Sequence, residues 1–287
     1  MGVTLAAILL SWKWRADVAL IVGTLGTVYV VGWCRLRRRD PGGALGWRLG
    51  LYVAGLAVLG LALLSPIDAL GALLFWAHMV QHELLTMVAP PLLLIGNPFA
   101  ALLWGLPRRW RQAAGRLLLP GAWSRRVLRV LTFMPVAWLL YVVSLWLWHL
   151  PAVYGASLRS AVVHDIQHLS FFATALLFWW PIVDPAPRLH GHVHHALRVA
   201  YVIPAAFQSQ ALGLIFAFLS SRILYTHYEA VPRLWGFTPL QDQSAAGLIM
   251  MQVEGLIYLA VVLTLIARMF AREERLTRWR EEHGLEP

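Results

Sequence analysis

Seven apolar runs dominate this chain, and each is close to the ~20 residues that cross a bilayer as a helix. Charged residues make up only 13% of the sequence, whereas a soluble domain has about 25%. The runs cover residues 18–34, 47–64, 70–95, 133–150, 161–183, 197–219 and 245–270. The sequence therefore predicts an all-α, polytopic membrane bundle of seven transmembrane helices, with residues 1–287 forming a single transmembrane domain.

Two charged segments complete the predicted domain. Residues 96–132 form an Arg-rich loop, and residues 271–287 form a tail. Within the loop, residues 99–106 are apolar but too short to span the membrane, and Pro98 and Pro107 bound them. We expect this short piece to lie at the membrane surface or to be re-entrant.

The Lys and Arg residues are distributed unevenly between the two ends of the predicted bundle. Nineteen of the 24 lie in the segments after the first, third, fifth and seventh runs, and the other 5 lie on the opposite side. Because cytoplasmic loops carry the excess of Lys and Arg, we expect the N-terminus outside, and the C-terminus, the 96–132 loop and the 271–287 tail in the cytoplasm. The net charge of +10 is concentrated in these short segments. This pattern is typical of topology determinants and contacts with the lipid bilayer, and not of nucleic-acid binding.

Two five-residue motifs, His78–His82 and His164–His168, both read H-x-x-Q-H inside apolar runs. Residues four apart share one face of a helix, so each motif points two imidazoles in the same direction. In the predicted orientation, all four histidines lie in the outer half of the membrane. Polar side chains there are costly and mark functional sites. We therefore predict that the four histidines form a shared metal site.

Further candidate ligands lie at a comparable depth on other predicted helices. His149 ends the fourth run, and Met251 and Glu254 lie in the seventh. By default, a methionine such as Met251 faces lipid or packs against its neighbours. Glu254 is interpreted as a metal ligand, a proton relay, or a protonated carboxyl bonded to a neighbouring helix.

Three polar side chains within the motifs have predicted supporting roles. Gln81 and Gln167 are expected to hold a ring tautomer, because amides are weak ligands and a ligating histidine needs its other nitrogen held. Asp165 either orients a histidine or pairs with Arg159.

The ligand types restrict the metal. An imidazole-rich site without thiolate suits Cu, Zn, Fe or Ni, and copper has the highest affinity in the divalent series. The lone Cys34 excludes a disulfide framework and a C-x-x-C site, and nearby thioethers favour Cu(I).

The zinc-protease motif H-E-x-x-H is absent, since the segment His82–Thr86 has no second histidine. Haem fits two i,i+4 pairs poorly, although His149 with another histidine is an alternative pair.

A separate histidine cluster, His190–His195, lies in a predicted cytoplasmic loop. We interpret it as part of a solvated loop, with metal capture as the alternative.

Several longer motifs resemble one family. These are Ala77–His82 continuing to Met87–Gly96, the second histidine motif with Phe178–Pro181, and Pro239–Gln243 before the last run. They are similar to the CtaG-type assembly factors of caa-type cytochrome c oxidase, over most of the chain.

The resemblance implies a seven-span protein of the bacterial plasma membrane that is required for maturation of the haem-copper oxidase and concerns its copper. By this resemblance, the family's motif histidines correspond to His78, His82, His164 and His168. Gln81, Gln167, Asp242 and Gln243 occupy further motif positions of unassigned role. The third position of the family's D-Q-Q motif is Ser244 here.

These inferences together predict a non-enzymatic assembly factor. It would hold copper as Cu(I) in the outer half of the membrane and pass it to, or stabilise, a subunit of cytochrome c oxidase. Two alternatives are a membrane enzyme with haem or zinc at the same histidines, and a copper transporter with the His190–His195 loop as its exit. The almost purely apolar inner halves of the runs argue against transport.

Overall fold

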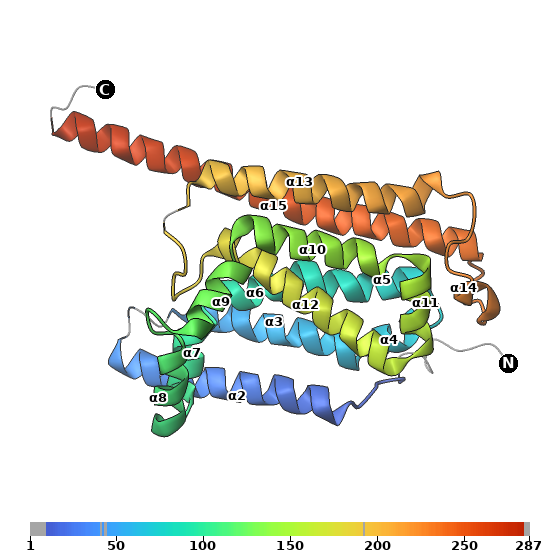
Figure 1. The fold of residues 1–287 in the computed structure, drawn as a ribbon, viewed down its shortest axis with the longest axis horizontal. Coiled ribbons are helices and arrows are strands. Elements are labelled where there is room, and N and C mark those ends of the chain that lie inside the picture. Colours follow the sequence, from blue (N-terminus) through green and yellow to red (C-terminus); the bar gives the residue numbers. More distant parts are fainter. Residues whose placement is uncertain (1–9, 41, 43–44, 192, 284–287) are drawn as a thin grey trace.

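The computed structural model describes residues 10–40, 42, 45–191 and 193–283, and every regular element within them is a helix (Figure 1). The helices are α2 (Ala16–Arg39), α3 (Gly46–Leu64), α4 (Pro66–Gly71), α5 (Phe75–Glu83), α6 (Ala89–Ile95), α7 (Pro98–Gly105), α8 (Arg108–Leu117), α9 (Trp123–Leu131), α10 (Met134–Trp148), α11 (Pro151–Arg159), α12 (Ala161–Val183), α13 (His195–Leu214), α14 (His227–Ala230) and α15 (Pro239–Glu282), with π-helical turns at Leu84–Val88 and Ile215–Leu219. The expected all-α class is confirmed.

Five helices in the described part of the chain are long and apolar enough to cross a membrane. They are α2, α3, α12, α13 with the π-turn that follows it, and α15. Two bent pairs, Phe75–Ile95 with α7 and α9 with α10, raise the number of candidate spans to as many as seven. The protein is therefore a multi-pass membrane protein, and the count of seven spans stays a prediction.

The long helices pack into a bundle with short helices at both ends. Helix α13 lies against α15, α15 against α5, α10 against α12, and α2 against α3 and α7. Helices α4, α11 and α14 lie at one end of the bundle, and α7, α8 and α9 at the other (Figure 1). We call these the histidine end and the Arg-rich end, because the H-x-x-Q-H motifs and the Arg-rich 96–132 segment lie near them.

Several helix boundaries differ from the sequence prediction, most clearly in the third and the last runs. The third run was expected to begin at residue 70, but the chain forms the separate helix α4 and starts the spanning helix at Phe75. Ser65 caps α4 by accepting a hydrogen bond from the backbone N–H of Ile67. The last helix continues to Glu282 through residues expected to form a tail, and its final turns protrude beyond the bundle (Figure 1).

Prolines shape the helix that carries the first histidine motif. Pro90 and Pro91 have no N–H to donate to the preceding turn, and the helix widens to a π-turn over Leu84–Val88 immediately before them. After α6, Asn97 adopts a left-handed backbone with φ of 51°. Pro98 then starts α7, which is bent by 69° from the Phe75–Ile95 helix.

Helices α2 and α7 approach closely through two glycines. A Cβ atom on Gly32 would lie 1.7 Å from the carbonyl oxygen of Ala101, and one on Gly105 would lie 1.9 Å from that of Val28. Neither position has room for a side chain, so the glycines fix how α7 lies on α2. The apolar 99–106 piece therefore packs on protein through at least one face.

We expect Gly32→Ala to lower the melting temperature of the detergent-purified protein by several degrees, because forcing a methyl group into this contact costs about 1–3 kcal/mol. Gly23→Ala on the same helix is the matched control, since nothing lies within 4 Å of a Cβ atom there. Alanine favours a helix over glycine by ~1 kcal/mol, so this control should be neutral or stabilising. Equal melting temperatures for the two variants would contradict the assigned contact.

Candidate metal centre

The two histidine motifs come together at the histidine end of the bundle. Each motif forms an i,i+4 pair on its own helix, with ring centroids 4.3 Å apart for His78 and His82 on α5, and 4.1 Å apart for His164 and His168 on α12. Between the helices, His78 lies 5.2 Å from His164, and His82 lies 5.5 Å from His168. The expected convergence of the four imidazoles is therefore present in the structure.

Three of the four histidines have the geometry to share one ion. One ring nitrogen from each of His78, His82 and His168 lies within 4.8 Å of the other two. All three side chains are buried, whereas His164 is half-buried and lies outside this group. We call these three residues the histidine triad.

Four of the six ring nitrogens of the triad lack partners in the described part of the chain. His78 Nε2, His168 Nε2 and both nitrogens of His82 are buried without a hydrogen bond in the described part of the chain. An unsatisfied buried polar group costs about 1–3 kcal/mol, so a packing role explains these rings poorly. A metal ion would use the free lone pairs, and the donor set is of the kind that copper and zinc accept.

His149 lies next to the triad, at the C-terminal end of α10. Its ring centroid is 6.1 Å from that of His82, and its Nδ1 lies 2.7 Å from the carbonyl oxygen of Leu145. That contact leaves Nε2, which is buried and has no partner among the described residues. His149 is thus a neighbour of the triad and not a member of it.

Gln81 points to α4 and not to an imidazole. Its amide nitrogen donates to the carbonyl oxygen of Ala62 at 2.8 Å and to Asp68 Oδ1 at 2.9 Å. Asp68 in turn forms a 2.6 Å ion pair with Lys13. Burial raises the pKa of Asp68, but the bonds from Lys13 and Gln81 outweigh it and hold the pKa below its ordinary value. Gln81 therefore joins α5 to α3 and α4.

Asp165 and Gln167, the other two residues with a predicted supporting role, differ in whether they have a polar partner. Asp165 forms an ion pair with Arg15, so the structure selects a partner that the sequence did not indicate in place of Arg159. Gln167 is fully buried, and neither of its amide atoms has a hydrogen-bond partner in the described part of the chain.

The candidate ligands of α15 point elsewhere. A Cβ atom on Gly213 of α13 would lie 2.5 Å from Met251 Cγ, so Met251 packs against α13. Met250 packs in the apolar core with Phe75 and Met79. Glu254 is buried and lies outside the triad, and its Oε2 has no hydrogen-bond partner among the described residues.

Glu83 is a buried acid that the sequence analysis did not select. It follows His82 directly, is only 4% exposed, and its Oε2 has no partner in the described part of the chain. Its position next to a triad member and inside an apolar run could have identified it as a candidate from the sequence.

Asp242 supports the triad from α15. Its carboxylate accepts hydrogen bonds from the backbone N–H groups of Phe75 at 3.0 Å and Trp76 at 2.9 Å, and it pairs with Arg233 at 3.0 Å. The first N–H groups of a helix have no partner within that helix, so Asp242 satisfies the start of α5 one turn before His78. Its neighbour Gln243 accepts from the N–H of Leu224 and donates to the carbonyl oxygen of Arg222.

The His190–His195 loop lies apart from the triad. The Nε2 atom of His190 is 3.0 Å from the hydroxyl of Thr132, and residue 192 lies outside the described residues. Within the described ranges, the loop forms no group of three ligands.

We expect Asp242→Ala to destabilise the protein by about 3 kcal/mol, since removing one partner of a buried ion pair costs about that much and two amides of α5 also lose their acceptor. The matched control is Asp17→Ala, which removes a carboxylate from an exposed ion pair with Arg15, a type of contact worth about 0–1 kcal/mol. Thermal unfolding in detergent measures both. The assigned role of Asp242 fails if the two variants unfold at the same temperature.

The fold and the site together define a class: a multi-pass helical membrane protein with a buried, imidazole-lined centre near one end of its bundle. The family model for the cytochrome c oxidase caa3 assembly factor, Caa3_CtaG, matches residues 27–272. The chain belongs to this family, and the resemblance seen in its motifs is confirmed.

The chain is also similar to mycobacterial proteins. It is 28% identical over 288 residues to the uncharacterized proteins Mb0105 of Mycobacterium bovis and MT0111 of Mycobacterium tuberculosis, covering 97% of this chain and 42% of each relative. It is 23% identical over 277 residues to the uncharacterized protein ML1998 of Mycobacterium leprae, covering 95% of this chain and 41% of that relative. The chain thus spans less than half the length of these relatives. No solved structure matches the chain significantly.

Proposed function

We propose that this protein binds one copper ion, as Cu(I), at the histidine triad and supports maturation of a copper centre in a caa-type cytochrome c oxidase. The observation that carries the proposal is a set of three buried imidazoles, one nitrogen of each lying within 4.8 Å of the other two. Each ring has at least one nitrogen without a hydrogen bond in the described part of the chain. Family membership is the basis for proposing the oxidase as the partner, because the family is that of a cytochrome c oxidase assembly factor.

The donor set supports copper over harder ions. Imidazole suits copper and zinc, whereas carboxylate, carbonyl and water suit magnesium, calcium and manganese. The free cysteine of the chain, Cys34, lies on the exposed part of α2. The proposed centre therefore uses nitrogen ligands alone.

The half-buried His164 gives the proposed centre a route for ion transfer. Its ring lies 5.2 Å from that of His78, so it is placed to accept the ion as a triad member releases it. A ligand from an oxidase subunit would then replace His164. The ion changes ligands without a change in oxidation state, so the proposal requires no enzymatic reaction.

The distribution of charge supports an orientation for this transfer. The arginines of α8, α9 and the end of α15 lie at the end of the bundle away from the triad. By the positive-inside rule, we place the Arg-rich end in the cytoplasm and the histidine end on the outer side of a bacterial plasma membrane. The triad would then face an oxidase subunit from the outer side.

Elemental analysis of purified protein, loaded anaerobically with Cu(I), tests the site. We expect the triple variant of His78, His82 and His168 to Ala to lose its copper. We expect His164→Ala to bind copper but to release it more slowly to a competing chelator. His283→Ala is the control, since that ring is exposed on the last turn after α15 and, among the described residues, contacts the carbonyl oxygen and the ring of Trp279. Equal copper in the triple variant and the control would contradict the proposal, as would zinc binding in preference to copper or a Soret band.

The client is tested in cells that depend on this protein for oxidase assembly. We expect the triple histidine variant, expressed at the wild-type level, to yield oxidase that contains haem but is deficient in copper. The His283→Ala control should restore the normal copper content. Oxidase with full copper in the triple-variant cells would contradict a role in copper delivery.

A further inference from the structure

A large cavity opens at the Arg-rich end, away from the histidine triad. It has a volume of about 870 Å³ and lies between α3, α6, α12 and α15. This volume is within the range of ligand pockets, about 300–1,000 Å³. The cavity contains none of the residues of the proposed metal centre.

The walls of the cavity are apolar. Leu94 of α6, Trp179 and Ile182 of α12, and Ile257 and Val261 of α15 face it. The indole N–H of Trp179 already donates to the carbonyl oxygen of Thr86. The surface that these side chains offer to a ligand therefore suits a hydrocarbon chain.

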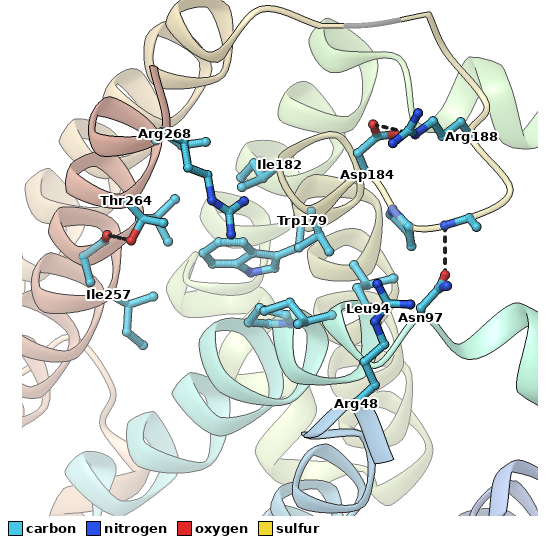
Figure 2. A pocket seen from close by; sticks show the side chains of 18 of the residues that line it. Arg48, Leu94, Asn97, Trp179, Ile182, Asp184, Arg188, Ile257, Thr264 and Arg268 are labelled. Atoms are coloured by element: carbon cyan, nitrogen blue, oxygen red, sulfur yellow. Dashed lines mark hydrogen bonds and ion pairs between the residues drawn. The ribbon is translucent and has the colours of Figure 1, made fainter. Parts of the chain in front are cut away.

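The mouth of the cavity is basic. Figure 2 shows Arg268 of α15 and Arg48 of α3 reaching toward the cavity from opposite walls, with the ring of Trp179 between them. Among the described residues, neither arginine forms an ion pair and Arg48 Nε is buried without a hydrogen bond, although the Arg48 guanidinium lies 5.3 Å from the centre of the Trp47 ring. In the described part of the chain, two positive charges at this mouth are thus left without an acidic partner.

The one acidic residue in the lining is already paired. Asp184 lies 3.6 Å from Arg188 (Figure 2), and it also lies 3.4 Å from Arg198. The side-chain oxygen of Asn97 accepts a hydrogen bond from the backbone N–H of Ala186. This bond holds the loop that follows α12 against this side of the cavity. The charge of Arg48 and Arg268 is therefore not neutralised by the lining.

We propose that this cavity binds an anionic phospholipid of the leaflet at the Arg-rich end. The phosphate lies between Arg48 and Arg268, and one acyl chain enters along Leu94, Trp179 and Ile257. Charge complementarity selects the occupant, because an apolar cavity with unpaired guanidinium groups at its mouth matches an acidic head joined to a hydrocarbon chain. The proposal is independent of the metal centre.

Lipid retention measured by native mass spectrometry tests the site. The purified protein is stripped of lipid and incubated with dioleoyl phosphatidylglycerol or with dioleoyl phosphatidylcholine. We expect one tightly retained phosphatidylglycerol and little phosphatidylcholine. Arg268→Gln should weaken retention by about fivefold, and the double variant R48Q/R268Q by more, because each arginine near a headgroup contributes about 1 kcal/mol. The control R116Q/R126Q removes two arginines of α8 and α9 that do not line the cavity.

Two further arms separate a lipid site from simple anion binding. Ala260→Phe adds bulk to the cavity wall and keeps both arginines, so it should reduce lipid retention as strongly as R268Q does. Inorganic phosphate in excess should not displace the lipid. Displacement by phosphate, unchanged retention in A260F, or equal retention in R268Q and R116Q/R126Q would each overturn the proposal. Melting temperatures of all variants, with R268Q as the mildest change, identify any loss due to misfolding.

Discussion

The arrangement of the candidate metal centre depends on one carboxylate. Asp242 at the start of α15 accepts from the first backbone N–H groups of α5 and pairs with Arg233. This contact joins the last long helix to the helix of His78 and His82, and it satisfies two donors that have no partner within α5. The position of the first two imidazoles follows from where α5 begins, and Asp242 fixes that beginning.

Buried polar side chains in this bundle divide into two sets. Residues of the first set complete their hydrogen bonds within the protein, as Asp242 does with α5 and as Gln243 does with the 222–224 segment. The second set has buried polar atoms without partners in the described part of the chain, and it includes the triad rings, His149, Gln167, Glu83 and Glu254. An unbonded polar atom is costly in an apolar interior, and the clustering of such atoms in the triad is the observation on which the proposed metal centre rests.

Much of this organisation could be predicted from the sequence, and the remainder required the structure. The apolar runs predict the long helices because length and hydropathy alone determine a span, and the i,i+4 spacing predicts the histidine pairs. Contacts between segments that are distant in the sequence leave no local pattern of residues from which they could be predicted. The pairing of Asp165 with Arg15, the packing of Met251 on Gly213 and the capping role of Asp242 depend on how helices pack, so the sequence left them open or unassigned.

In the proposed centre copper is held by imidazole nitrogens alone, and X-ray absorption at the copper edge of the Cu(I)-loaded protein measures its ligands. We expect nitrogen scatterers with the multiple-scattering pattern of imidazole and no sulfur scatterer in the first coordination sphere. That signal should disappear in the His78, His82 and His168 triple variant. A sulfur scatterer at full occupancy would place Met251, Met250 or Cys34 on the ion and would contradict the assigned centre.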